Sequence, residues 1–308
     1  MRSKYELSRI LKVSAFLLVI IGISNAYAQD DDRVPLLNAI IPGGTHFYEG
    51  DIREGLAFLI PEASLFALGV FINDQLETET SQEWSIPWLV AGQLYGIDKW
   101  RYFQKSQLRL QQGFPNYQLP IRFDPTPLSE LLFAPFNPKV ILSPLVLTFA
   151  ALGIIDGIVA YPKNNENYSD ISSVIALSNQ MDRETGTYYY ESMALVVSYG
   201  AAVSEEMMFR GLLLPVLDAQ LGKRRGLITT SLIFGLLHLF NSDIDKPLYF
   251  VSQATLAGLV FGYHVQRNDY RLSEAIAAHF WYNFVSMTTT WLTNPKENPL
   301  GIQVRFEF

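Results

Sequence analysis

Apolar residues in this chain are grouped into long runs that short polar stretches separate. Seven runs approach the length of about 20 residues that a helix needs to cross a bilayer; they cover 54–73, 84–103, 139–161, 190–215, 226–241, 247–265 and 272–292. Several contain Pro, Gly or ionisable residues, which favours helices that pack on one another over helices that face only lipid. The pattern therefore predicts an all-α fold, a polytopic membrane helix bundle.

The charges of the connecting stretches indicate how these runs are oriented. Basic residues cluster in 99–109, 222–225 and 266–271, whereas acidic residues cluster in 74–83, 164–184 and 241–245. Because cytoplasmic loops carry the excess of Lys and Arg, we expect the basic stretches in the cytoplasm. The alternation requires one more crossing near 34–50, where Pro42-Gly43-Gly44 predicts a broken or re-entrant helix. The prediction is therefore seven to eight spanning helices.

The N-terminus is typical of an export signal. Basic residues at positions 2, 4, 9 and 12 precede an apolar run over 13–23, and Ala26 and Ala28 supply the small residues that signal peptidase requires. We expect a signal peptide over 1–28, with an uncleaved signal anchor as the alternative. Either form places the next residues outside the cytoplasm, and we expect a multi-pass protein of the bacterial inner (cytoplasmic) membrane.

Composition narrows the classes of partner and chemistry. The 308 residues include 49% hydrophobic and 17% charged residues, and the formal net charge is −7. A nucleic-acid partner would need a basic face, so this balance disfavours one. The expected partners are the lipid bilayer and a membrane-associated protein or peptide substrate. The absence of cysteine excludes disulfides, thiolate zinc sites and cysteine nucleophiles.

Proline suggests how the chain is divided. Six prolines between residues 110 and 138 forbid a long helix there and predict a linker. The linker would separate an N-terminal helical membrane unit over 29–109 from a main intramembrane domain over 139–295. Residues 296–308 alternate apolar and polar positions, which predicts an amphipathic tail able to form one exposed strand.

Ionisable residues inside apolar runs are costly at membrane depth and are therefore candidates for a functional site. Three runs carry such groups: Glu205, Glu206 and Arg210, then His238, then His279 and Asn283. Glu206 and Arg210 are four residues apart, so they share a helix face and can neutralise each other. Glu205 points in another direction and is expected to face a polar cavity. A carboxylate, an imidazole and a His/Asn pair could activate a water and stabilise an oxyanion.

In this order on successive helices, the motifs Glu-Glu-x-x-x-Arg, Phe-x-x-x-His and His-x-x-x-Asn resemble the CPBP family, the CAAX proteases and bacteriocin-processing enzymes also called Abi. The resemblance covers about 190–290. It implies a glutamate-dependent intramembrane endopeptidase in which Glu205 and His238 activate the attacking water. It assigns His279 and Asn283 to the oxyanion site, and it gives Glu206 and Arg210 supporting roles in the first motif.

Alternatives stay open for both mechanism and function. We expect no cofactor; in the alternative mechanism, His238, His279 and Glu205 hold a zinc ion, although the His-Glu-x-x-His pattern is absent. In the alternative function, the chain is a non-catalytic membrane scaffold or bacteriocin-immunity protein that binds a peptide in the same cavity. A transporter is disfavoured because the sequence has no internal repeat.

Four other polar residues receive structural assignments. Glu62 and Asp156 lie within apolar runs and are expected to be polar partners of neighbouring helices. His46 is expected to be structural, and His264 is expected to anchor a helix end at the membrane interface.

Overall fold

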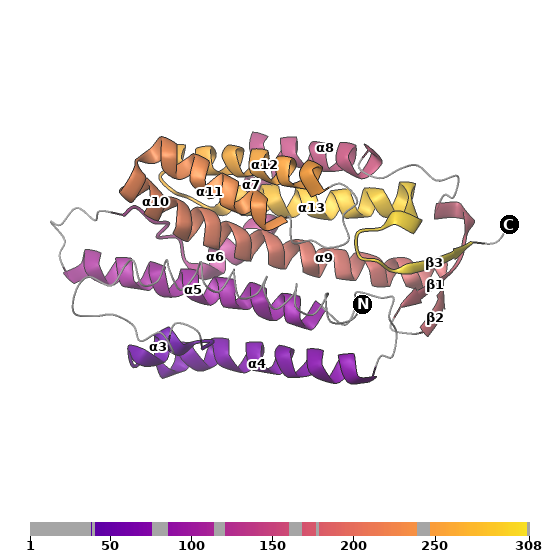
Figure 1. The fold of residues 1–308 in the computed structure, drawn as a ribbon, viewed down its shortest axis with the longest axis horizontal. Helices are drawn as coiled ribbons and strands as arrows, with labels where there is room; N and C mark the ends of the chain where they lie inside the picture. Colours follow the sequence, from indigo (N-terminus) through magenta and orange to yellow (C-terminus); the bar gives the residue numbers. More distant parts are fainter. Residues whose placement is uncertain are drawn as a thin grey trace. The chain divides into compact units, whose positions relative to one another are not determined.

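The computed structural model describes residue 38 and residues 41–75, 86–113, 121–159, 168–176, 179–238 and 247–306. These residues form mainly α-helices, with three short strands (Figure 1). The helical fold predicted from the apolar runs is therefore confirmed, and the sheet is an addition to it. The predicted signal peptide over 1–28 lies outside the described residues and stays a prediction.

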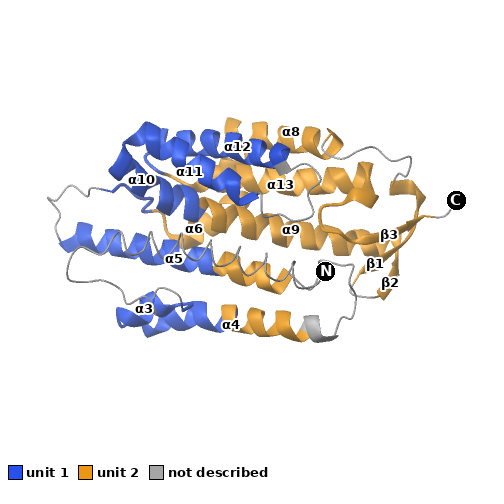
Figure 2. Ribbon diagram, in the orientation of Figure 1, with its two compact units in different colours: residues 1–61, 95–125, 207–270 blue, residues 62–94, 126–206, 271–308 orange. Residues whose placement is uncertain are grey.

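The chain divides into two compact units that interleave along the sequence. Unit 1 comprises residues 1–61, 95–125 and 207–270, and unit 2 comprises residues 62–94, 126–206 and 271–308 (Figure 2). Three long helices each contribute to both units, because the boundaries fall within α4 (Ile52–Gln75), α5 (Ile86–Gly113) and α9 (Arg183–Met208).

Two helices of the described part are long and apolar enough to cross a membrane, judged by length and composition alone. These stretches are Ile52–Phe71 of α4 and Leu248–Arg267 of α12 (Pro247–Arg267), and α8 (Pro144–Val159) is a shorter apolar helix. Much of the apolar surface of α4 is exposed, including more than half of the side chains of Ile52 and Phe66. The count of seven to eight spans stays a prediction, because two helices of the described part meet this criterion.

Unit 1 begins with a tight turn that precedes a five-residue helix, α3 (Gly44–Tyr48). Gly43 adopts a φ of 67°, and a side chain there would collide with the Gly55 carbonyl of α4, so only glycine fits this turn. The break predicted near Pro42 is therefore confirmed within residues 41–50. The rest of unit 1 includes a π-helix (Phe209–Leu213), α10 (Leu214–Leu221), α11 (Lys223–Leu237) and α12.

From Leu128 on, the end of the proline-rich segment forms short helices in unit 2. They are α6 (Leu128–Phe133), η2 (Ala134–Phe136) and α7 (Pro138–Ile141). Tyr199 of α9 donates a hydrogen bond to the Leu132 carbonyl at 2.9 Å, and Trp281 of α13 (Ser273–Thr293) donates to the Pro135 carbonyl at 3.0 Å. Residues 128–141 are therefore packed against α9 and α13.

A three-stranded antiparallel sheet joins the ends of α9 and α13 in unit 2. Its order is β2 (Asn179–Asp182), β1 (Ile171–Ala176) and β3 (Gln303–Phe306); η3 (Tyr168–Asp170) precedes β1 and η6 (Pro295–Glu297) follows α13. Asp182 caps α9, because its carboxylate accepts the Thr185 N–H at 2.9 Å. Since β3 belongs to the C-terminal tail, the strand predicted there is confirmed.

Small residues allow α8 to lie unusually close to α13. A Cβ atom added at Gly153 would come within 2.6 Å of the Tyr282 carbonyl, and one at Gly157 within 2.6 Å of the Ser286 carbonyl. Asp156, between the two glycines, accepts a hydrogen bond from the Ser286 hydroxyl at 3.1 Å. Asp156 is therefore a polar partner of the neighbouring helix, as its position in an apolar run predicted.

Candidate active site

Within unit 2, the C-terminal end of α9 and the first half of α13 bring three of the candidate side chains together. The Nδ1 atom of His279 lies 2.8 Å from Oε1 of Glu206, which is a hydrogen bond. The Nε2 atom of the same ring lies 4.0 Å from Oε2 of Glu205. The imidazole therefore has one carboxylate near each of its nitrogens.

The two carboxylates differ in solvent exposure because neighbouring residues on a helix point about 100° apart. The Glu206 side chain is fully buried, whereas the Glu205 side chain is 34% exposed. An ionised carboxylate can only accept, so the hydrogen bond to Glu206 requires the proton of a neutral His279 on Nδ1. The Nε2 atom then faces the carboxylate that water can reach.

Asn283 follows His279 by one turn of α13 and is half-buried. Residues four apart lie on the same face of a helix, so Asn283 is placed on the side of α13 that carries His279. Its amide can donate a hydrogen bond where the ionised carboxylates cannot.

The other two candidate residues belong to unit 1. His238 directly follows α11 as its C-cap residue, and its Nδ1 atom lies 2.9 Å from the Phe234 carbonyl of the preceding turn. Donation from Nδ1 to that carbonyl leaves Nε2 of a neutral ring as an acceptor. Its predicted convergence with Glu205, which belongs to unit 2, stays a prediction.

Arg210 lies in the π-helix that follows α9, an irregularity often found at functional sites. Its guanidinium is almost fully buried and lies 4.1 Å from the centroid of the Phe234 ring and 5.6 Å from that of Phe261. Cation–π contacts of this kind stabilise a buried arginine. The predicted pairing of Arg210 with Glu206 joins the two units and stays a prediction.

No group of three or more His, Asp or Glu side chains that could hold a metal ion is found among the described residues. In unit 2, Glu205 and His279 supply two donor groups, and the third member of the alternative zinc set, His238, belongs to unit 1. The zinc alternative therefore stays a prediction.

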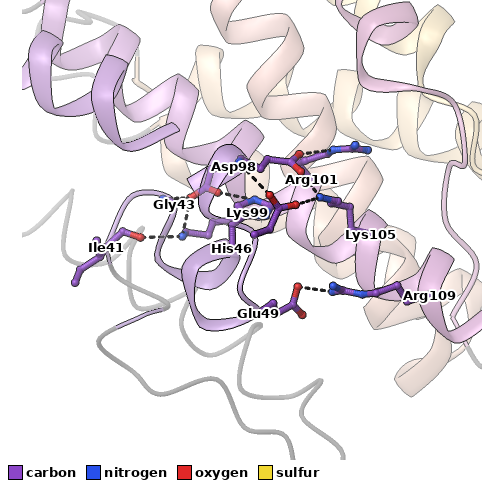
Figure 3. Close-up of polar contacts among 11 residues, drawn as sticks. Ile41, Gly43, His46, Glu49, Asp98, Lys99, Arg101, Lys105 and Arg109 are labelled. Atoms are coloured by element: carbon purple, nitrogen blue, oxygen red, sulfur yellow. Dashed lines mark hydrogen bonds and ion pairs between the residues drawn. The ribbon is translucent and has the colours of Figure 1, made fainter. Parts of the chain in front are cut away.

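A second polar cluster, which the sequence analysis did not predict, lies in unit 1 (Figure 3). Asp98 of α5 is fully buried; one of its oxygens lies 3.1 Å from Nε2 of His46, and the other accepts from Lys99 Nζ at 2.8 Å and from the Gly43 N–H at 3.0 Å. Lys99 also donates to the Ile41 carbonyl at 3.3 Å. These contacts hold the turn before α3 against α5, which agrees with a structural role for His46.

Ion pairs extend this cluster along α5. Arg101 and Lys105 both contact Glu54, Lys105 also lies 2.6 Å from Asp51, and Arg109 pairs with Glu49. The hydrogen bond from Lys105 lowers the pKa of Asp51 to about 2. The basic stretch 99–109 is therefore largely neutralised by acidic side chains around the start of α4.

Comparison with known proteins tests the family predicted from the motifs. Residues 190–285 match the family model described as type II CAAX prenyl endopeptidase Rce1-like. No curated protein and no solved structure matches the chain at a significant level. The matched segment spans the three motifs, from Glu205 to Asn283. Residues 190–285 are therefore similar to the Rce1-like family, and the resemblance to CAAX proteases that the motifs indicated is confirmed for this segment.

Proposed function

We propose that this chain hydrolyses a peptide bond in a membrane-associated protein or peptide. The observation that carries the proposal is the placement of His279 between a buried and a water-accessible carboxylate. The Rce1-like match indicates a hydrolase of the CAAX-protease type. Ionisable side chains are tolerated in apolar helices when they serve such a site.

In the proposed mechanism, Glu205 is the general base, and His238 helps to position the attacking water. Glu205 takes a proton from water while the water oxygen bonds to the carbonyl carbon of the substrate. The exposed fraction of this carboxylate supports the assignment, because a general base must meet water. The proton then passes to the leaving amine as the tetrahedral intermediate collapses.

His279 and Asn283 are the proposed oxyanion donors. A protonated His279 has two N–H groups; Nδ1–H remains on Glu206, and Nε2–H can donate to the developing oxyanion. Asn283 adds an amide N–H one turn away. Donors that are already in place when charge develops give the largest stabilisation of such intermediates.

The test is peptide cleavage by the purified full chain in liposomes. Because the matched family is described as prenyl endopeptidases, the first probe is a farnesylated peptide ending in Cys-aliphatic-aliphatic-X, and the same peptide without the lipid is the second. Release of the C-terminal tripeptide is measured by mass spectrometry. Binding of either peptide without any cleavage would favour the scaffold function instead.

Glu205→Gln is the decisive variant. The amide keeps the shape of the side chain but cannot take a proton from water, so we expect a rate loss on the order of 10²–10⁴-fold. Glu184→Gln, an exposed position in the first turn of the same helix, is the matched control and should cleave normally. Full activity of Glu205→Gln would contradict the mechanism. Loss of activity in a chelator that added zinc restores would instead favour the zinc alternative.

A further inference from the structure

Three successive residues of α13, which begin three positions after Asn283, are held by polar side chains from two other helices of unit 2. The three contacts are Ser286 Oγ to Asp156 Oδ2 at 3.1 Å, Tyr190 OH to the Met287 carbonyl at 3.0 Å and Thr288 Oγ1 to Glu191 Oε2 at 2.7 Å. We call Asp156, Tyr190 and Glu191 the α13 collar. Asp156 lies on α8, and the other two lie on α9.

Hydroxyl side chains in a helix commonly bond to the carbonyl one turn earlier in their own helix. Thr290 and Thr293 do so here, with distances of 2.9 Å and 2.8 Å to the carbonyls of Ser286 and Thr289, and each hydroxyl also lies 3.4 Å from the Gly157 carbonyl of α8. Ser286 and Thr288 reach carboxylates of other helices, so their hydroxyls join α13 to its neighbours through charged acceptors.

The collar resists rotation of α13 about its own axis. Ser286 and Thr288 are two residues apart and therefore project about 200° apart, toward opposite sides of the helix. Because the two hydroxyls are held from opposite sides, turning α13 in either direction displaces both of them from their carboxylates. Tyr190 is fully buried, and its ring stacks on that of Trp291 with 4.3 Å between the ring centroids, so its hydroxyl is itself held in place.

Rotation matters because the candidate oxyanion donors lie on the same helix. A turn of about 20° moves an atom about 5–6 Å from the helix axis by roughly 2 Å. A misplacement of about 1 Å can reduce a rate about 10²-fold. Ser286 lies three residues after Asn283 and seven after His279, so the collar acts about one turn from the first proposed donor and two turns from the second.

We propose that Asp156, Tyr190 and Glu191 are positioning residues that set the orientation of His279 and Asn283. This proposal rests on the proposed peptidase function. None of the three touches the reacting atoms, so each acts through α13.

The kinetic test uses Asp156→Leu, Tyr190→Phe and Glu191→Met in the full chain, with the farnesylated peptide in liposomes, because these changes remove the hydrogen-bonding groups and keep the size of the side chains. Each single variant should lower kcat about tenfold and leave KM unchanged, and Tyr190→Phe with Glu191→Met should lower kcat about 10²-fold. Tyr188→Phe removes an exposed hydroxyl from the same helix and should match the wild type. A purely structural role would lower the yield or the melting temperature while leaving kcat per folded molecule unchanged.

A second readout is independent of activity. The natural chain has no cysteine, so Asn283→Cys provides a single thiol whose rate of reaction with a maleimide reports the orientation of that position. Tyr190→Phe and Glu191→Met should each change this rate at least threefold, and Tyr188→Phe should not. Unchanged kcat and unchanged thiol rates in all collar variants would overturn the proposal. If the wild type cleaves neither peptide but the thiol rates shift, the peptidase function fails while the control of α13 orientation stands.

Discussion

The imidazole ring of His279 lies near two carboxylates that differ in their exposure to solvent. Glu206 is buried and bonded to Nδ1, whereas Glu205 is partly exposed and lies beyond hydrogen-bond distance of Nε2. A buried acceptor fixes the orientation and the protonated nitrogen of an imidazole. An exposed carboxylate can exchange protons with water. The same residue type therefore supports two roles at neighbouring positions.

This difference leads to a prediction for Glu206. Glu206→Gln removes the charge that holds Nδ1–H, and its amide can turn its own N–H groups toward the ring. In a related arrangement, the serine-protease triad, replacing the aspartate by asparagine lowers kcat about 10⁴-fold. We expect Glu206→Gln to lower kcat by 10²–10⁴-fold, on the order of that effect, with unchanged amounts of folded protein. Normal cleavage together with poor expression would show that Glu206 acts only in folding.

Asp98 permits a second prediction, for stability. Asp98→Asn leaves the buried Lys99 without its counter-charge, and breaking a buried ion pair from one side costs about 3–5 kcal/mol. The matched control is Asp269→Asn, because Asp269 is 85% exposed and its pair with Arg122 is expected to contribute at most about 1 kcal/mol. Denaturant unfolding in detergent measures both. If both variants lost equally little free energy of unfolding, the cluster around Asp98 would not stabilise the fold.

At the scale of elements, α8 and α13 depend on the absence of side chains where they meet. The Cβ of Gly157→Ala would lie 2.7 Å from the Cβ of Thr289 as well as close to the Ser286 carbonyl. We expect this overpacking to destabilise the fold by about 1–3 kcal/mol. Gly92→Ala is the control, since nothing lies within 4 Å of its Cβ position, and alanine there should stabilise α5 by up to about 1 kcal/mol. We expect the free energy of unfolding to fall in Gly157→Ala and to rise in Gly92→Ala.

At the scale of the whole molecule, the charge pattern leads to a prediction of topology. It predicts that the basic segments 99–109, 222–225 and 266–271 face the cytoplasm and that 163–187 does not. Single cysteines in this cysteine-free chain, Gln112→Cys and Asn165→Cys, should react with a membrane-impermeant maleimide from opposite sides of sealed vesicles. Labelling of both from the same side would contradict the topology. The result also matters for the site, because the topology decides on which side of the membrane a substrate is cleaved.

The sequence by itself determined the helical class, the break near Pro42, the C-terminal strand and the family resemblance of residues 190–285. Each of these follows from local information: apolar runs of helical length, a Pro-Gly-Gly turn, an alternating tail, and three motifs in order. It did not predict the three-stranded sheet, in which one of the two strand pairings joins β1 to β3, more than 120 residues away. Pairing at that distance leaves no periodic signal in β1 alone.

Only the tertiary structure decided which side chains meet across helices. Spacing on one helix suggested Arg210 as the partner of Glu206, but the hydrogen bond within unit 2 joins Glu206 to His279, 73 positions away. The contacts of Asp98 with His46 and of Glu191 with Thr288 were equally hidden. Periodicity reports the face on which a residue lies, whereas the partner depends on the rotation and register of another helix. Close packing of distant segments fixes those quantities, and no local pattern contains them.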